Sequence, residues 1–207
     1  MRPVTYAPTG LFVALEGGEG AGKSTQAALL RDALVAEGRT VLLTREPGAT
    51  AVGAEIRRIV LDPATGELHP RTEALLYAAD KAEHVDQVVR PALARGEVVV
   101  TDRYVDSSLA YQGGGRDALE GLEPMLRWAT GDLRPHLTVV LDLEPGAGLS
   151  RFAERDRIEA EPPAFHARVR QAFVELAERD PEHYLVLDAR DDVDTIAKLI
   201  LERVREL

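Results

Sequence analysis

Short runs of apolar residues alternate along the chain with longer segments of helical periodicity. Several of the short runs are apolar at successive positions, a pattern typical of strands that are covered on both faces. The candidate strands are residues 11–15, 40–43, 98–101, 137–141 and 184–187. The candidate helices are residues 25–37, 51–61, 71–95, 118–130, 148–155, 164–179 and 193–204. This alternation predicts a single α/β domain, residues 1–207, with a five-stranded parallel sheet flanked by helices.

Three interruptions refine this pattern. Pro91 lies inside the longest helical segment, where we expect it to kink or divide the helix. Gly113, Gly114 and Gly115 form a run that predicts a flexible connection. Residues 159–163 are a polar break that ends in two prolines.

The composition is that of a globular protein with an acidic surface. Apolar residues make up 45% of the chain, and no apolar run approaches the length of a membrane span. The formal net charge is −10, so neither nucleic acid nor an anionic membrane is an expected partner. The lack of cysteine excludes disulfides and agrees with a cytoplasmic location. Residues 1–10 carry one Arg and no apolar block, which predicts a short leader rather than a secretory signal.

A glycine-rich loop follows the first candidate strand and precedes the first candidate helix. It fits the pattern G-x-x-x-x-G-K-[ST] and consists of Gly17, Gly18, Glu19, Gly20, Ala21, Gly22, Lys23 and Ser24, followed by Thr25. The backbone N–H groups of such a loop, and the N-terminal end of the helix after it, bind polyphosphate. Lys23 is expected to reach the β- and γ-phosphates, and the Ser24 hydroxyl to ligate Mg²⁺. The loop therefore predicts nucleotide binding, but it does not say what the nucleotide is used for.

The third candidate strand is followed by Asp102 and Arg103. A carboxylate at the end of a buried strand, opposite a phosphate loop, is placed to hold the Mg²⁺ shell directly or through water. Arg103 offers a planar fork for a second phosphate group. Alone, the two residues would be interpreted as a surface ion pair; the phosphate loop favours the functional interpretation.

Further polar residues follow the other strands or share a helix face. Glu46 and Arg57 suit a polar substrate, although both could be solvated charges. Tyr77 and Lys81 lie four residues apart on one helix face, where they could bind a base or belong to an ordinary core. The downstream segment supplies two hydroxyls, a phenol and a carboxamide: Ser107, Ser108, Tyr111 and Gln112. A carboxamide can pair with a base edge, but this composition also suits an ordinary polar helix end.

An arginine cluster lies near the polar break, and its members are Arg151, Arg155 and Arg157. In an acidic protein such a cluster could close over transferring phosphates and neutralise their charge. A solvated helix face with Arg–Glu pairs is the alternative. The five histidines show no metal-ligand spacing and receive no role.

These blocks, in this order, resemble the bacterial thymidylate kinases along nearly the whole chain. The matching segments are residues 12–24, 44–48, 75–81, 102–113 and 156–159. The resemblance implies the P-loop NTPase fold of the nucleoside monophosphate kinases, with a short lid at about residues 148–162. It also implies transfer of the γ-phosphoryl group of ATP to dTMP with Mg²⁺, giving dTDP and ADP for dTTP synthesis. The expected assembly is a homodimer formed through helices.

The resemblance further assigns roles by position. Tyr77 is expected to stack on thymine, and Arg57 and Arg103 to hold the acceptor phosphate. Tyr111 is expected near the sugar, where it disfavours a ribose 2′-OH. The other acceptor-site residues expected are Glu46, Lys81, Ser107, Ser108 and Gln112. The expected catalytic residues are Lys23, Arg103, Glu19 and the lid arginines Arg151 and Arg155, with Ser24 and Asp102 as metal ligands.

Three features depart from the family pattern. Lys81 stands where Arg is common, and the loss of the planar fork weakens bidentate contact with the base. Glu19 stands where relatives often carry Asp, which changes its reach to the acceptor phosphate or the metal. The segment between Arg151 and Asp156 is short for a lid. Because the phosphate loop has no Arg of its own, a lid arginine is expected to supply that charge.

Two other functions are compatible with the residues. One is another nucleoside monophosphate kinase that prefers dUMP or dCMP, a possibility that Lys81 keeps open. The other is a P-loop nucleotide switch or partitioning ATPase, whose output is a protein contact. Guanine-switch motifs of the N-K-x-D type are absent, which argues against a GTPase.

Overall fold

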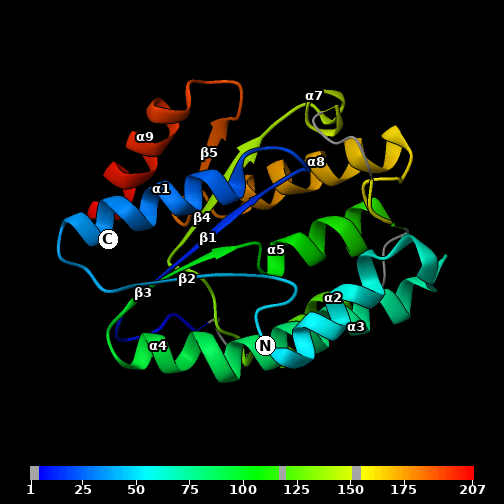
Figure 1. Cartoon of the computed structure of the whole chain (residues 1–207), viewed down its shortest axis with the longest axis horizontal. Coiled ribbons are helices and arrows are strands. Elements are labelled where there is room, and N and C mark those ends of the chain that lie inside the picture. The colour runs from blue at the N-terminus through cyan, green and yellow to red at the C-terminus, as the bar shows by residue number, and fades with distance from the viewer. Residues whose placement is uncertain (1–4, 117–119, 151–154) are drawn as a thin grey trace.

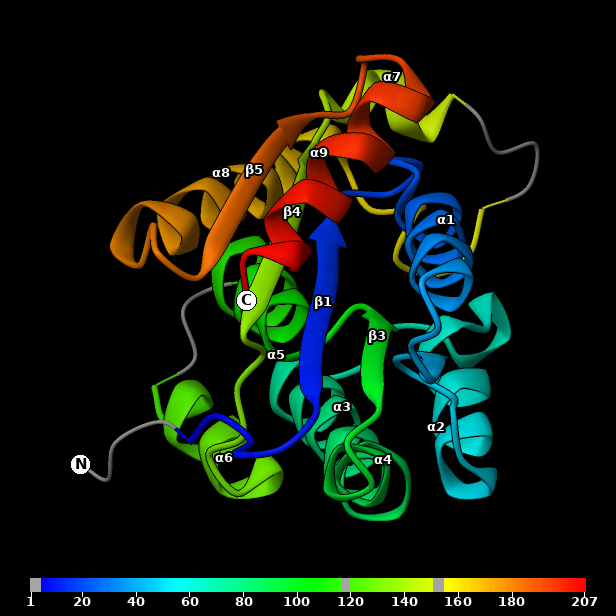
Figure 2. The same cartoon turned by 90° about the vertical axis from the view of Figure 1, so that its left-hand side faces the viewer.

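The computed structural model describes residues 5–116, 120–150 and 155–207. In this part of the chain the predicted strands form one sheet in the order β2-β3-β1-β4-β5, and every pairing is parallel. The strands are β1 (Leu11–Gly17), β2 (Val41–Arg45), β3 (Val98–Asp102), β4 (Leu137–Asp142) and β5 (Tyr184–Asp188). The expected fold class, α/β with a five-stranded parallel sheet flanked by helices, is confirmed. Figure 2 shows β1 in blue between β3 and β4.

Helices lie on both sides of this sheet (Figure 1). One face is covered by α1 (Lys23–Ala36) and α9 (Val193–Arg205). The remaining α-helices of the described residues are α2 (Ala51–Leu61), α3 (Pro70–His84), α4 (Arg90–Ala94), α5 (Val105–Ser108), α6 (Leu122–Thr130), α7 (Pro145–Leu149) and α8 (Pro163–Arg179). A 3₁₀ turn, η1 (Pro63–Thr65), and two π-helical turns, η2 (Val85–Val89) and η3 (Leu109–Gly115), complete the connections.

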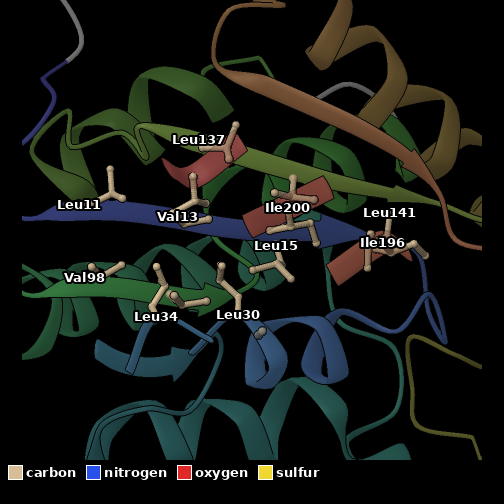
Figure 3. Packing of buried hydrophobic residues seen from close by; sticks show 14 of the residues in the cluster. Leu11, Val13, Leu15, Leu30, Leu34, Val98, Leu137, Leu141, Ile196 and Ile200 are labelled. Atoms are coloured by element: carbon tan, nitrogen blue, oxygen red, sulfur yellow. The ribbon is translucent and has the colours of Figure 1, made fainter. Parts of the chain in front are cut away.

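Strand β1 shows why consecutive apolar residues are needed here. Its odd positions, such as Val13 and Leu15, pack with Leu30 of α1 and Ile200 of α9 (Figure 3). Its even positions, such as Phe12, point to the other face and pack against α3, α4 and α6. Because side chains alternate along a strand, burial on both faces requires an unbroken apolar run. The interpretation of these runs as doubly covered strands is confirmed.

The helix expected at residues 71–95 is divided, as we predicted from Pro91. The division starts at Val85, six residues before the proline. The segment consists of α3, η2 and α4, with Pro91 in the first turn of α4. Proline has no N–H for the carbonyl four residues before it, at Gln87, and its ring crowds that carbonyl. The wider π turn at residues 85–89 accommodates this loss.

The glycine run was expected to be a flexible connection, and this prediction is wrong. Gly113, Gly114 and Gly115 end η3; Gly113 lies against Leu122 of α6, and Gly114 and Gly115 pack closely on α8. A Cβ atom would lie 2.7 Å from Cβ of Ala172 at Gly114, and 2.6 Å from Cε2 of Phe165 at Gly115. The glycines therefore allow two helical segments to approach each other.

Two other helices differ from their predicted bounds. Helix α7 begins at Pro145, three residues before the expected start at Gly148, and ends at Leu149. Residues 151–154 of that expected helix lie outside the described residues. Helix α6 begins at Leu122, and residues 118 and 119 of the expected helix 118–130 also lie outside the described residues. None of the helices described is both long enough and apolar enough to cross a membrane.

Candidate active site

A cavity of about 480 Å³ opens where β1, β2 and β3 end. The predicted site residues that line it are Glu19, Gly20, Gly22, Lys23, Ser24, Thr25, Glu46, Arg57, Tyr77, Asp102, Arg103, Ser107, Ser108, Tyr111 and Gln112. Within the described residues, the predicted ones that do not line it are Gly17, Gly18, Ala21, Lys81 and Arg155. The carboxyl ends of parallel strands are where ligands collect in open α/β sheets, so this cavity is the candidate active site.

The phosphate loop connects β1 to α1 and needs glycine for its shape. Gly20 has a φ of 70°, and a Cβ atom there would lie 2.5 Å from the carbonyl oxygen of Gly148. Gly17 has a φ of 135°, and its Cβ would lie 2.4 Å from the carbonyl oxygen of Leu141. Side chains at these positions would be both strained and blocked, so the loop can curl only with glycine here.

Lys23 opens α1 and is held beneath this loop. Its Nζ donates to the carbonyl oxygens of Gly17, at 3.1 Å, and Gly18, at 2.7 Å. Burial and the positive charge of Arg103 lower the pKa of Lys23 to about 8, although Glu19 and nearby carboxylates act in the other direction. Lys23 therefore carries its positive charge at neutral pH and loses it not far above. The charge lies where polyphosphate binds in such loops.

Ser24 and Asp102 meet across the floor of the cavity. The Ser24 hydroxyl donates a hydrogen bond to Oδ2 of Asp102, which ends β3. Mg²⁺ takes oxygen ligands, often only one or two from the protein, with water and phosphate completing its shell. These two oxygens fit that requirement. The described residues hold no cluster of three or more His, Cys, Asp or Glu side chains suited to a metal.

Arg103 lies on the opposite wall with its backbone in the left-handed region, at a φ of 72°. Its Nη2 donates to Oε1 of Glu19 at 2.6 Å, and its Nη1 donates to Oγ of Ser107 at 3.1 Å. The guanidinium carbon lies 5.0 Å from the centre of the Tyr111 ring, and the Tyr111 hydroxyl donates to the same Oε1 at 2.8 Å. Burial alone would raise the pKa of Glu19, but Arg103, Lys23 and Tyr111 lower it to about 2. Glu19 is therefore an anion that aligns two other side chains.

Glu16 holds this wall in place, and we did not predict that role. It ends the apolar part of β1, is fully buried, and accepts hydrogen bonds from the N–H groups of Tyr104, at 2.7 Å, and Ser107, at 3.1 Å. Its Oε2 accepts from the Ser107 hydroxyl at 2.6 Å. Burial and the neighbouring Asp106 raise the pKa of Glu16 to about 7. A carboxylate from β1 thus caps the start of α5.

Lys81 does not lie on the cavity wall, in contrast to the expectation that it contacts the base. Its side chain is 2% exposed, and Nζ donates to Oε2 of Glu46 at 2.8 Å. Nδ1 of His84 lies 2.7 Å from the other oxygen of Glu46. A lysine that is committed to a buried carboxylate cannot reach the cavity in this arrangement. Glu46 itself does line the cavity, as expected.

The segment after β2 is also held by α2 and α3. Nη1 of Arg57 donates to the carbonyl oxygen of Pro47 at 3.0 Å, and Oδ1 of Asp80 accepts from the N–H of Gly48 at 2.9 Å. The peptide bond between Glu46 and Pro47 is cis. Arg57 and Arg103 both line the cavity.

Three residues expected to bind a base also line the cavity. They are Tyr77 of α3, Ser108 of α5 and Gln112 of η3. The Ser108 hydroxyl oxygen is buried and has no hydrogen-bond partner among the described residues. Nε2 of Gln112 donates to Oε1 of Glu73 at 3.1 Å. An aromatic ring, an unpaired hydroxyl and an oriented carboxamide can together bind a flat polar ring.

The arginine cluster is only partly described. Arg151 lies outside the described residues, and Arg155 is exposed. Arg157 faces inward: its Nη2 donates to Oε2 of Glu73, and its Nε donates to the carbonyl oxygen of Val60 at 2.8 Å. The roles of Glu16 and Glu73 were missed, although each precedes a motif: Glu16 directly precedes the phosphate loop, and Glu73 lies one helical turn before Tyr77.

A phosphate loop after the central strand, with Arg and Glu residues and a tyrosine ring that line the same cavity, defines the class. The protein is a P-loop kinase of the nucleoside monophosphate type.

Comparisons with known proteins identify the family. A family model described as thymidylate kinase matches residues 15–200. The chain is 52% identical over 199 residues to a thymidylate kinase of Cutibacterium acnes, covering 96% of this chain and 98% of that one. It is 56% identical over 194 residues to one of Leifsonia xyli subsp. xyli, covering 91% of each. A crystal structure of thymidylate kinase from Ehrlichia chaffeensis superposes with a TM-score of 0.78 at 28% identity, covering 96% of this chain and all of that one. The chain belongs to the thymidylate kinase family.

Proposed function

We propose that the cavity holds ATP and dTMP end to end, with the phosphate loop binding the donor and the Arg103 wall binding the acceptor. As a member of its family, the chain transfers the γ-phosphoryl group of ATP to dTMP, and this membership decides against a nucleotide switch. The observation that carries the assignment of the two halves is that Lys23, from the start of α1, and Arg103, directly after β3, line one cavity.

The donor half is formed by the phosphate loop and the end of β3. Gly17, Gly18, Glu19, Gly20, Ala21, Gly22, Lys23, Ser24 and Thr25 are proposed to surround the triphosphate. Ser24 and Asp102 are proposed to hold Mg²⁺, directly or through water; when bound, the ion would neutralise charge on the β- and γ-phosphates. Lys23 is positioned to release its two carbonyl partners and bind phosphate oxygens instead.

The acceptor half begins with the phosphate group. Arg57 and Arg103 are proposed to hold it, since both residues line the cavity and a guanidinium group suits a phosphate. Tyr111 is proposed to lie near the sugar, and Tyr77 to stack on thymine. Ser108 and Gln112 are proposed to contact the edge of the base. Glu46 and Ser107 line this half, and Lys81 acts only through Glu46.

Catalysis then requires little covalent chemistry from the protein. Phosphoryl transfer is accelerated mainly by placing the two reactants in line and by stabilising charge on the transferred group. Lys23 and Arg103 both donate to the carbonyl oxygen of Gly17, so their charges lie close together beside the phosphate loop, and Glu19 orients Arg103. A lid arginine, Arg151 or Arg155, is proposed to add charge when the lid closes, because the phosphate loop has no Arg of its own.

One assay tests this function. Release of ADP from Mg-ATP is measured with dTMP, dUMP, dCMP, dGMP and the ribose form TMP as acceptors. We expect strong dependence on dTMP, weaker use of the ribose form because of Tyr111, and little ADP release without an acceptor. Release that is independent of the acceptor would overturn the proposal, and a preference for dUMP or dCMP would reassign the substrate.

The assembly proposed is a homodimer in the cytoplasm, where its nucleotide substrates are found. Large apolar side chains are exposed on two helices that pack against each other: Leu75 of α3 is 58% exposed and Trp128 of α6 is 83% exposed. Such residues are typical of an interface. Sedimentation of the wild type and of a Leu75→Glu variant tests this: the wild type should sediment as a dimer and the variant as a monomer.

A further inference from the structure

The carboxamide of Gln112 has one orientation imposed on it by a buried charge. Glu73 of α3 is fully buried, and three side chains donate to it: Gln112, Arg116 and Arg157. Burial alone would raise the pKa of Glu73, but the hydrogen bonds from Arg116, Gln112 and Arg157 outweigh burial and lower it. Glu73 is therefore ionised, and an ionised carboxylate only accepts hydrogen bonds.

An acceptor-only partner decides which end of the amide faces it. Gln112 must turn its NH₂ group toward Glu73, as the distance of 3.1 Å between Nε2 and Oε1 reflects. A flip would oppose two oxygens in a buried site, which is costly. Because Gln112 also lines the cavity, the group that it offers to a ligand is its carbonyl oxygen, Oε1.

We propose that Glu73 is a positioning residue: through Gln112 it makes the pocket select a pyrimidine base that carries a hydrogen atom on N3. This inference rests on the proposed role of Gln112 in contacting the base. Thymine and uracil carry N3–H, which donates to Oε1 of Gln112. Cytosine has a lone pair at N3, which faces the same oxygen and is repelled. The pocket excludes cytosine through the orientation of an amide rather than through its shape.

The two arginines give Glu73 its fixed charge and position. Nη2 of Arg116 donates to Oε2 of Glu73 at 3.1 Å, while Nη1 of Arg116 pairs with Glu161 at 2.6 Å. Arg157 is anchored on the carbonyl oxygen of Val60 in α2. Glu73 is thus connected through Arg116 to Glu161, near the end of the expected lid segment, and through Arg157 to the helix that carries Arg57. It cannot turn away from Gln112 without breaking these pairs.

The experiment compares kcat/KM for dTMP with kcat/KM for dCMP in a set of variants. Glu73→Gln has the same shape but can donate or accept, so Gln112 becomes free to turn its NH₂ group toward the cavity. We expect the preference for dTMP to fall by about tenfold or more, the effect of one buried hydrogen bond. Glu83→Gln is the matched control, because it makes the same exchange on α3 at a carboxylate whose partner is Gln87 rather than Gln112; its preference should stay at the wild-type value.

Two further variants separate positioning from simple support of the fold. Glu73→Asp keeps a negative charge near both arginines but moves the carboxylate away from Gln112 by the length of one methylene group. The preference for dTMP over dCMP should therefore fall. The melting temperature should change less than in Glu73→Gln. The exchange variant, Glu73→Gln with Gln112→Glu, puts an acceptor at position 112 in either orientation and should regain the preference for dTMP. Wild-type preference in both Glu73→Gln and Glu73→Asp, or no recovery in the exchange variant, would overturn the inference. Failure of the proposed function would be distinct, since the wild type would then not depend on dTMP.

Discussion

The guanidinium group of Arg103 and the carboxylate of Glu19 face each other across the cavity, with 2.6 Å between Nη2 and Oε1. The pair joins the end of β3 to the phosphate loop, and each side chain is less than one-fifth exposed, at 16% and 17%. The same Glu19 oxygen accepts the Tyr111 hydroxyl. One oxygen atom of the phosphate loop thus sets the position of two other side chains.

Glu19→Gln should therefore reduce turnover more than it affects folding. The variant keeps the shape of Glu19 but loses the charge that orients Arg103, and a hydrogen bond to a charged group contributes about 1.5–3 kcal/mol. We expect kcat to fall by about tenfold to a hundredfold. The control is Glu37→Gln, whose partner Arg205 lies on the exposed surface; its kcat should not change. Equal kcat values for the two variants would show that the Glu19–Arg103 pair is not needed.

The pH dependence of ATP use should report Lys23. Burial and Arg103 lower the pKa of Lys23 to about 8 in the free protein, and only its protonated form attracts phosphate. The charge is present below this pKa and is lost as the pH rises through it, so kcat/KM for ATP should decline above about pH 8. At saturating ATP the bound phosphates favour the ammonium form, and the decline in kcat should move to higher pH. A profile of kcat/KM for ATP that stays flat to about pH 9.5 would contradict this assignment.

The sequence predicts the sheet, the phosphate loop and most of the cavity wall because these depend on local patterns. Apolar runs identify the strands, and residues after parallel strands meet at one edge. Lys81 shows the limit of such reasoning. Its partner Glu46 lies 35 residues earlier, and both are buried between α3 and the end of β2. Helical spacing places Lys81 on the face of Tyr77 but cannot say whether its charge reaches the ligand or another side chain. The glycines of η3 were misinterpreted for the same reason, since their contacts are with the distant helices α6 and α8.

Lys81→Met should be strongly destabilising. Removing one partner of a buried ion pair leaves the other charge without compensation, which costs about 3–5 kcal/mol; the contact of His84 with Glu46 should keep the cost at the lower end. The control is Lys198→Met, which removes an exposed pair with Glu202 and should cost less than about 1 kcal/mol. Urea unfolding measures both. Similar losses in the two variants would mean that the Lys81–Glu46 pair does not form in the folded protein.

Asp102→Asn should raise the Mg²⁺ concentration needed for activity. The amide is a weaker ligand than the carboxylate, and its NH₂ group can no longer accept a hydrogen bond from Ser24. We expect the half-saturating Mg²⁺ concentration to rise by about tenfold to a hundredfold. Titration of Mg²⁺ at fixed ATP checks this, with Asp32→Asn, an exposed partner of Arg31, as the control. An unchanged Mg²⁺ requirement would remove Asp102 from the metal site.

Gly115→Ala tests the close packing of η3 on α8. The added Cβ would lie 2.6 Å from Cε2 and 2.9 Å from Cζ of the Phe165 ring, and 2.9 Å from Cγ2 of Val169. These side chains belong to a buried cluster that also contains Tyr111, so the ring cannot move away without disturbing the cavity wall. Overpacking of this kind costs about 1–3 kcal/mol, and displacement of Tyr111 should also raise the KM for dTMP. Gly146→Ala in α7 is the matched control, because its Cβ would meet nothing within 4 Å and should leave stability unchanged or slightly increased. Thermal unfolding and dTMP kinetics are measured on both variants; a Gly115→Ala protein as stable as Gly146→Ala would indicate that the glycine run is a loose connection after all.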